Sequence, residues 1–269
     1  CEFDILGTGA LYNLELNCGG NIAKSYGATT TIDNDLTINN ALFRTDNNRA
    51  VTVTGDVVVN NGGTLGNAET AAWSLGSLTI NSGGTYSATS GATTITNYFS
   101  NAGTYTHTSG DIVFSNDPLA QFTGDATFYN LTTNAAVFNS SDDNITIATG
   151  GTLTQQGNIT ANILDIRGEM SIGAGEKVTF DDTTGSGFAG TGNLTIAGSD
   201  GNLANITNAG TTEWTMPHPT LNSTWDYVAV SYGNNTGTEA IIVYDGTDSG
   251  NNVPVGMWIF STDTPDNCI

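Results

Sequence analysis

The sequence of 269 residues has few cationic side chains. It contains 5 Lys and Arg residues against 26 Asp and Glu residues, which gives a formal net charge of −21. Binding to nucleic acid needs a basic face that contacts phosphates, and so few scattered cations cannot form one. An anionic membrane surface is disfavoured for the same reason. We therefore expect no nucleic-acid partner, and we interpret the acidic surface as one that keeps a β-rich chain soluble.

Cysteine and long apolar runs are also scarce. The three cysteines, Cys1, Cys18 and Cys268, form no Cys-x-x-Cys or Cys/His pattern, so no zinc site is predicted. They are candidates for disulfides instead: either Cys1 bonds Cys18 within one chain, or Cys268 bonds Cys1 or Cys18 of another copy. No apolar run approaches the ~20 residues of a membrane span, and we expect none. A chain that begins at Cys1 is expected to be a processed chain or a segment of a longer one.

Helical periodicity is absent. Charged residues make up only 12% of the chain, and Gly, Asn, Thr and Ser are abundant in their place. These residues favour turns and short strands. Apolar residues instead alternate with polar ones, which places them on one face of a strand. The sequence therefore predicts an all-β protein in which these alternating residues point inward: Val51, Val53, Val57, Val59, Leu78, Ile80, Ile145, Ile147, Leu194 and Ile196.

One unit recurs along the chain: a short strand, then Asn or Thr, a Gly turn, Thr and another strand. Copies lie at 57–65, 78–86, 98–105, 145–153 and 206–211. The Thr positions of successive copies are separated by 21, 19, 48 and 59 residues, close to multiples of about 20, a length typical of solenoid coils. A second motif at 7–17 aligns without gaps on 124–134, at an offset of 117 residues, near six such coils.

This repetition predicts a parallel β-solenoid (β-helix) of about ten or eleven coils. A β-sandwich would show no fixed repeat of this length. Each coil is expected to bury its inward residues against the coils on either side, with Asn and Thr side chains stacked in ladders. We assign residues 1–214 to the solenoid repeats. Three of the four Trp residues lie from Trp214 onward, and residues 215–269 are assigned to the final coils and an irregular, aromatic-rich C-terminal cap.

The repeats and three closing segments resemble the right-handed β-helical repeat regions of large secreted microbial surface proteins, of the haemagglutinin and autotransporter-passenger type. The closing segments are Asp226-Tyr-Val-Ala-Val-Ser-Tyr232, Asp248-Ser-Gly-Asn-Asn252 and Trp258-Ile-Phe260. The resemblance implies an extracellular or cell-surface location and a role as an adhesin, stalk, fibre or coat. Some related folds carry polysaccharide-cleaving sites, so the fold alone does not decide the function.

Polysaccharide lyases and hydrolases need carboxylates clustered with basic residues on adjacent coils. The basic residues here are scattered: Lys24, Arg44, Arg49, Arg167 and Lys177. The pairs Asp142-Asp143 and Asp181-Asp182 are interpreted as acidic turns, because adjacent residues on a strand point to opposite faces. His218, between two prolines, is interpreted as a buried structural histidine. We therefore expect no enzyme, with no catalytic and no cofactor-binding residues.

Two acidic segments and a set of asparagines are the remaining candidates for metal binding and modification. Asp33-Asn-Asp35 and Ser141-Asp-Asp-Asn144 offer oxygens in turns, but no complete calcium-binding loop exists. The sequence therefore predicts no metal ligands, and it leaves open only a weak surface calcium ion. Eight Asn-x-Ser/Thr sequons are candidate glycosylation sites: Asn130, Asn139, Asn144, Asn158, Asn193, Asn205, Asn222 and Asn234.

From these observations we expect a structural subunit of an extracellular fibre, sheath or surface layer. Its main partners would be copies of itself, associated head-to-tail through the solenoid ends, because open strand edges recruit other strands. The alternative is an adhesin or glycan-binding surface module that presents Tyr and Trp side chains to surface glycans. A polysaccharide lyase or hydrolase is the third and least favoured hypothesis.

Overall fold

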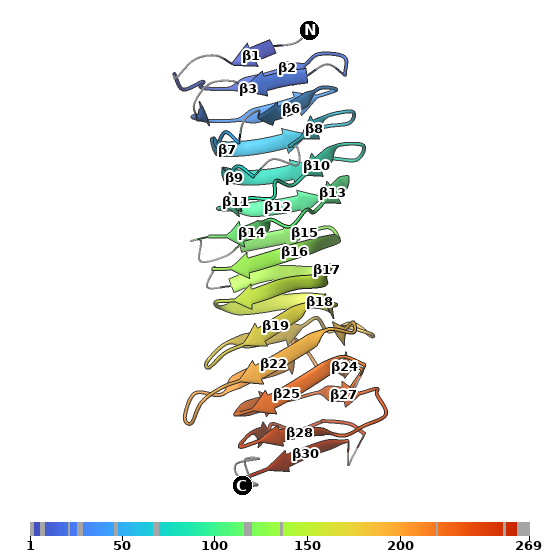
Figure 1. The fold of residues 1–269 in the computed structure, drawn as a ribbon. Helices are drawn as coiled ribbons and strands as arrows, with labels where there is room; N and C mark the ends of the chain where they lie inside the picture. Colours follow the sequence, from blue (N-terminus) through green and yellow to red (C-terminus); the bar gives the residue numbers. More distant parts are fainter. Residues whose placement is uncertain are drawn as a thin grey trace. The chain divides into compact units, whose positions relative to one another are not determined.

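The computed structural model describes residues 3–5, 9–20, 22–25, 29–45, 48–66, 70–115, 120–134, 137–218, 220–254 and 257–262. These residues form β-strands and turns with no helix, and the strands wind into a parallel β-solenoid of about 10 coils, as the repeats predict (Figure 1). The chain divides into two compact units, Cys1–Thr132 and Thr133–Ile269, and each is described separately.

The first unit consists of three parallel sheets, one for each side of a coil. The first sheet contains β1 (Phe3–Ile5), β3 (Ile22–Ser25), β6 (Leu42–Thr45), β8 (Thr64–Leu65), β10 (Thr85–Ser87) and β13 (Thr104–Thr106). The second contains β4 (Thr30–Ile32), the first halves of β7 (Val51–Val59) and β9 (Trp73–Ile80), β11 (Thr93–Ile95), β14 (Asp111–Phe114) and β16 (Ala126–Thr133). The third contains β2 (Leu14–Asn17), β5 (Leu36–Asn39), the second halves of β7 and β9, β12 (Tyr98–Asn101) and β15 (Ala120–Thr123).

The second unit repeats the three-sheet plan. One sheet contains the start of β17 (Val137–Gln155), the start of β18 (Asn158–Ile166), β20 (Lys177–Phe180), β23 (Ala204–Asn208), β26 (Val228–Val230) and β29 (Thr247–Asp248). The next contains the middle of β17, the end of β18, β21 (Gly187–Ala189), β24 (Trp214–Met216) and β27 (Gly233–Asn235). The last contains the end of β17, β19 (Glu169–Ile172), β22 (Asn193–Ala197), β25 (Asn222–Asp226), β28 (Ile241–Tyr244) and β30 (Trp258–Ser261).

The repeated threonines stack in register. Thr85 of β10 pairs with Thr64 of the preceding coil and with Thr104 of the following coil. The intervals between these threonines in the sequence are therefore the lengths of single coils. The repeat spacing, which predicted the stacking, is confirmed for these three copies.

Glycine pairs at one corner allow the coils to approach closely. Gly83 has φ +79°, a left-handed conformation that glycine adopts without steric cost. A Cβ on the following Gly84 would lie closer than 3.0 Å to the carbonyl oxygen of Val59 in the neighbouring coil. The Gly-Gly dipeptide after Asn81 therefore serves both the turn and the contact between coils.

Asparagines next to these turns form a ladder between coils. The side-chain amide of Asn81 donates to Oδ1 of Asn60 (2.7 Å), and that of Asn60 donates to Oδ1 of Asn39 (2.7 Å). The Asn39 amide donates to Glu15 Oε1 (2.9 Å). This ladder confirms the predicted stacking of Asn side chains. The ladder ends in the next coil, where Ala102 occupies the position equivalent to Asn81. The Ala102 backbone N–H donates to Ile80 O, just as the Asn81 backbone N–H donates to Val59 O.

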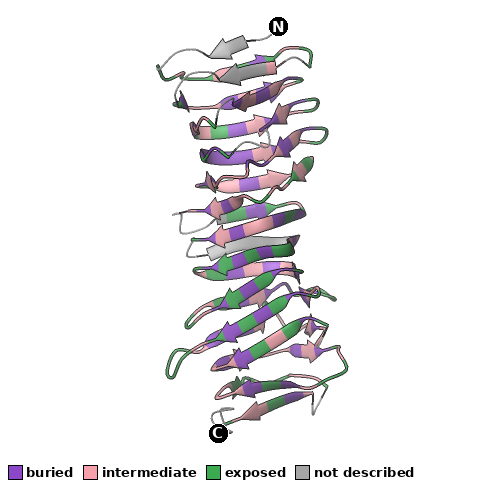
Figure 2. Ribbon diagram, in the orientation of Figure 1, coloured by how far each residue is buried: buried purple, intermediate pink, exposed green. Residues whose placement is uncertain are grey.

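The core lies inside the coils, where the inward residues are buried (Figure 2). Every residue predicted to point inward is at most 1% exposed, which confirms the strand phase. Aromatic residues fill the space between sheets in each unit. In the first unit, the rings of Phe99 and Phe122, in adjacent coils, stack with centroids 5.4 Å apart.

The prediction of an acidic turn at Asp142-Asp143 is wrong. Both residues lie within β17, where the pairing with β18 shifts register between Ser140 and Asn144. The chain passes this corner within one strand, and residues 141–143 are left out of the ladder between β17 and β18. The pair Asp181-Asp182 does lie in a turn after β20, although Asp181 is buried there.

The strands of 215–269 continue the parallel stacking. β25 pairs with β22, β28 with β25, and β30 with β28. The final coils of this segment therefore belong to the solenoid, and residues 263–269 lie outside the described part of the chain. The C-terminal cap stays a prediction.

Candidate functional site

The structure places one of the three disulfide candidates. Cys18 is half-buried, directly after β2. Cys1 and Cys268 lie outside the described residues, so both pairings predicted from the sequence stay predictions.

The glycosylation candidates differ in accessibility. Asn158, Asn193 and Asn222 are exposed. Asn193 and Asn222 lie side by side in adjacent coils, where the Asn222 amide donates to Asn193 Oδ1 (3.0 Å). The half-buried candidates are Asn130, Asn144, Asn205 and Asn234, and the side chain of Asn139 is outside the described part. The amide of Asn130 donates to Asp111 Oδ1 and that of Asn234 to Glu213 Oε2. Accessibility thus favours Asn158 as a glycosylation site.

Of the two segments considered for calcium, 33–35 holds the backbone of a neighbouring coil: Asp35 Oδ1 accepts a hydrogen bond from the Asp56 backbone N–H (2.9 Å). In the other segment, the side chains of Ser141 and Asp142 lie outside the described residues. The acidic pair after β20 also binds backbone groups, because Asp182 Oδ1 accepts from the N–H groups of Thr211 (3.1 Å) and Thr212 (2.8 Å). Among the described residues, no group of three or more His, Cys, Asp or Glu is placed to hold a metal ion.

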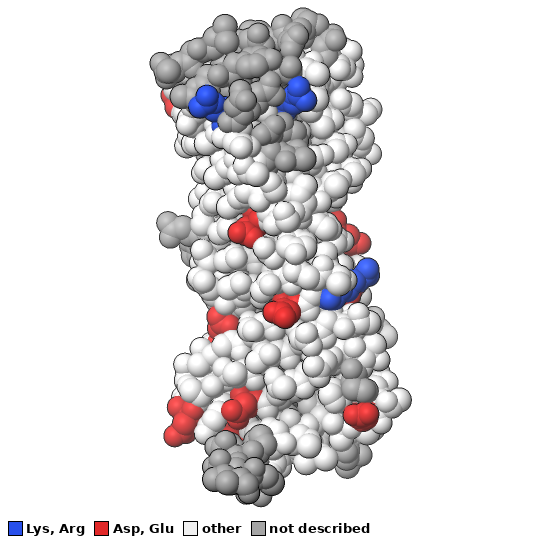
Figure 3. Space-filling model, in the orientation of Figure 1, with Lys and Arg blue, Asp and Glu red and all other residues white. Residues whose placement is uncertain are grey.

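The basic residues that the sequence analysis found scattered do not gather into a cleft with paired carboxylates in the described part. Arg167 forms an ion pair with Asp165 on the same strand end (2.6 Å). This exposed pair raises the pKa of the Arg167 guanidinium, because the Asp165 carboxylate accepts its hydrogen bonds and stabilises its charge. Figure 3 shows acidic and basic side chains as small separate patches on a mostly uncharged face.

The second unit has a groove in the wall of the solenoid, between β25 and β28. The ladder between these strands joins Trp225 to Val243 and Asp226 to Tyr244, and no other residues of the two strands are paired in the described structure. By contrast, β22 and β25 pair along five residues, and β28 and β30 along four. The first halves of β25 and β28 therefore lie apart and leave a groove of about 450 Å³.

A small side chain contributes to this opening. Ser223 stands in register with Leu194 of the preceding coil, which is buried and fills the interior. The serine is too small to fill the same space, so the wall is not packed shut at this point. Ser223 Oγ instead lies 3.2 Å from Nδ1 of His218, and one of the two atoms donates to the other.

Two loops at one corner of the coils hold the polar end of the groove. The buried side chain of Asn235 donates to the carbonyl oxygen of Glu239 (2.7 Å) and accepts from the Gly237 N–H (3.0 Å). The Thr238 N–H donates to the carbonyl oxygen of His218 (3.0 Å), which ties the two loops together. Glu239 and His218 are thus positioned by a buried amide and by backbone hydrogen bonds.

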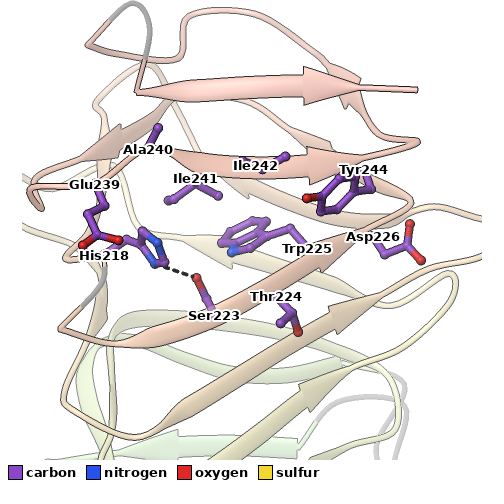
Figure 4. A pocket seen from close by; sticks show the side chains of 10 residues that line it. All are labelled: His218, Ser223, Thr224, Trp225, Asp226, Glu239, Ala240, Ile241, Ile242 and Tyr244. Atoms are coloured by element: carbon purple, nitrogen blue, oxygen red, sulfur yellow. Dashed lines mark hydrogen bonds between the residues drawn. The ribbon is translucent and has the colours of Figure 1, made fainter. Parts of the chain in front are cut away.

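Figure 4 shows how the lining side chains are arranged. His218 and Glu239 lie at one end, and Tyr244 and Asp226 lie at the other. The indole of Trp225 lies between them, below Ile241 and Ile242 in this view. His218 is half-buried and lines the groove, so the prediction that it is buried is wrong, whereas its structural role stays a prediction. The small Ser223 leaves its imidazole open to the groove.

Aromatic residues form the floor of the groove. Trp225 stacks on Trp214 (ring centroids 6.4 Å apart) and meets Trp258 edge-on (5.4 Å). The indole N–H of Trp214 donates to Ser231 O (2.7 Å) and that of Trp258 to Val253 O (3.1 Å). The Trp225 indole N–H is buried and has no hydrogen-bond partner among the described residues. The tryptophan that lines the groove is therefore the member of this cluster whose donor is left over.

The groove is acidic. It carries the carboxylates of Asp226 and Glu239, and no Lys or Arg is among the described residues that line it. Asp226 Oδ1 is buried without a hydrogen-bond partner in the described structure. The pKa of the adjacent Tyr227 is raised, mainly because the nearby Asp245 carboxylate disfavours the phenolate. Loss of solvation and the carboxylates of Asp200 and Asp226 act in the same direction. This side of the solenoid thus favours uncharged or cationic groups.

Comparisons with protein-family models, with curated proteins and with solved structures found no match to this chain. The fold therefore follows from the repeats and the structure alone. The described part of the chain contains no helix with the length and hydropathy needed to span a bilayer.

The sequence offered only a partial signal for the groove. It showed that aromatic residues concentrate after Trp214, and it singled out His218 between two prolines. It did not show that Glu239 and Tyr244 would lie beside them, because that depends on the register of two loops and on the early end of one ladder. The small Ser223 at a position where the neighbouring coil has Leu194 is the clue available once the coils are aligned.

Proposed function

We propose that this chain is a structural subunit of an extracellular fibre, sheath or surface layer and that its copies associate through the ends of the solenoid. The observation that supports the proposal is the edge of β30. This strand pairs with β28 along one edge, and no described strand pairs with the other. A strand edge of this kind offers backbone donors and acceptors to another strand. Head-to-tail contacts between such edges need not close into a ring, so they can continue as a fibre.

Negative-stain electron microscopy and sedimentation velocity of the purified chain test the proposal. We expect concentration-dependent association and regular end-to-end particles without any added ligand. A sample that stays monomeric over the whole accessible concentration range would overturn it.

The disulfide alternatives are separated by gel electrophoresis of the assembled material without reductant. A ladder that collapses when reductant is added supports a bond from Cys268 to Cys1 or Cys18 of another copy. A single monomer band excludes that bond and agrees with a Cys1–Cys18 bond within one chain. Association itself is measured independently, because strand edges can pair without a disulfide.

We further propose that the chain has no catalytic activity on polysaccharides. The basic residues are scattered along the sequence, whereas lyases and hydrolases of this architecture need basic residues beside their carboxylates. Assays on neutral and acidic polysaccharides, with and without calcium, are expected to show no turnover. Reproducible turnover that disappears when one Asp is replaced would contradict the proposal.

An adhesin or glycan-binding surface module is the second candidate function. The groove between β25 and β28 favours it, because its volume of about 450 Å³ falls within the size of small-molecule sites and its lining combines aromatic, apolar and polar groups. The two functions are compatible, since a surface fibre can also present binding sites along its length.

A further inference from the structure

We infer that the groove between β25 and β28 binds uncharged sugar residues of a glycan. The inference rests on the second candidate function and adds to it a site and a class of ligand. The hydrogen-bonding groups of the groove, its apolar surface and its charge support it.

The hydrogen-bonding groups of the groove suit a ligand rich in hydroxyls. The carboxylates of Asp226 and Glu239 accept hydrogen bonds. The hydroxyls of Ser223 and Thr224 both donate and accept. A sugar hydroxyl also donates and accepts, so it can bond to each of these groups.

The apolar part of the groove fits the C–H face of a sugar ring. Ile242 is 41% exposed and the ring of Tyr244 lies next to it on β28 (Figure 4). Trp225 is only 2% exposed, so it acts as the floor and not as a stacking platform. A sugar would therefore lie against Tyr244 and Ile242, with its hydroxyls toward Glu239 and Asp226.

The charge of the groove excludes acidic sugars. Uronic acids, sialic acids and sulfated sugars would bring an anion close to two carboxylates, without a Lys or Arg among the described lining residues to offset it. The chain as a whole has a formal net charge of −21, which adds to the repulsion. The ligand class is therefore restricted to uncharged sugars.

Two other hollows in the described part of the second unit lack this combination. One, beside Lys177 and Asn205, has a volume of about 350 Å³, and another, beside Arg167 and Glu169, has about 310 Å³. Neither has an aromatic side chain among its described lining residues. The groove at Trp225 is larger than both, and its loops are held by the buried Asn235.

The full chain is tested on an array that contains neutral hexose oligosaccharides, sialylated and uronic acid glycans, and cationic glucosamine oligomers. We expect binding to a subset of the neutral glycans and none to the acidic ones. Tyr244→Ala and Glu239→Gln are each expected to weaken the strongest neutral glycan by about tenfold, measured by calorimetry. Tyr12→Ala, which removes an exposed aromatic ring of the first unit (71% exposed), serves as the control and is expected to leave affinity unchanged.

The outcomes separate the site from the proposed function. Binding to neutral glycans that no groove variant alters overturns the site and leaves the adhesin function standing. No binding to any glycan overturns both. Binding only to the cationic oligomers, lost when salt is added, overturns the ligand class, because it reflects attraction to the net charge.

Discussion

At the scale of single residues, asparagine has a structural role that its abundance in the sequence only suggested. The amides of Asn39, Asn60 and Asn81 join successive coils of the first unit, because each donates to a side chain of the preceding coil. The three side chains are half-buried, and these hydrogen bonds give each amide a partner within the solenoid. The ladder can therefore be tested both by breaking it and by lengthening it.

Replacing Asn60 with Ala removes two of these hydrogen bonds. We expect the free energy of unfolding to fall by about 1–3 kcal/mol, the sum of two typical net contributions. Ala102→Asn places a donor next to Asn81 Oδ1 in the following coil and is expected to raise stability by about 0.5–1.5 kcal/mol. Both are measured by urea unfolding. If Asn60→Ala had no effect, the ladder would be a consequence of coil stacking and not a contribution to it.

Asp182 gives stability a dependence on pH. The side chain and backbone N–H of Thr212, together with the Thr211 N–H, hold the pKa of this carboxyl below its ordinary value. A lowered pKa in the folded state means that the contribution is present above the ordinary pKa of Asp and is lost as the pH falls through the folded value. Asp182→Asn should therefore lower the melting temperature more at about pH 7 than at about pH 3. An equal change at both pH values would show that the charge of Asp182 has no part in it.

At the scale of strands, alternation of apolar and polar residues was a sufficient guide to the core. It predicted the inward face of β7, β9, β17 and β22, because a strand has a period of two and only one face of each coil is enclosed. It could not predict how a coil turns its corners. β7 and β17 pass them by shifts of register within one strand, and alternation does not report such shifts.

The strand phase itself is open to a direct test at Ile147. This residue of β17 is fully buried and pairs with Ile166 in the next coil. Ile147→Asp would place a charge without a partner in the core, so we expect the free energy of unfolding to fall by about 3–5 kcal/mol. Thr154→Asp, on the exposed face of the same strand, should change stability by less than about 0.5 kcal/mol. Equal melting temperatures for the two variants would contradict the inward assignment.

At the scale of the whole molecule, the repeats carried enough information for the fold and too little for the site. A coil length near 20 residues and threonines in register specify parallel stacking, since each coil contacts only its neighbours. The groove arises where this regularity fails, between Ser223 and Ile241, and a repeat pattern contains no information about its own exceptions. Sites in solenoids are therefore best sought where the ladder between two coils is interrupted.

The net charge of −21 sets the conditions under which copies of the chain can meet. Subunits that carry the same large charge repel each other, and salt shortens the range of this repulsion from about 30 Å at 0.01 M to about 8 Å at 0.15 M. Association through strand edges depends on backbone hydrogen bonds at short range, which salt screens far less. We therefore expect sedimentation velocity to show monomers at low salt and growing end-to-end species as sodium chloride is added at constant protein concentration. Association that weakens with added salt would mean that ion pairs hold the subunits together, and the edge of β30 would then not be the contact.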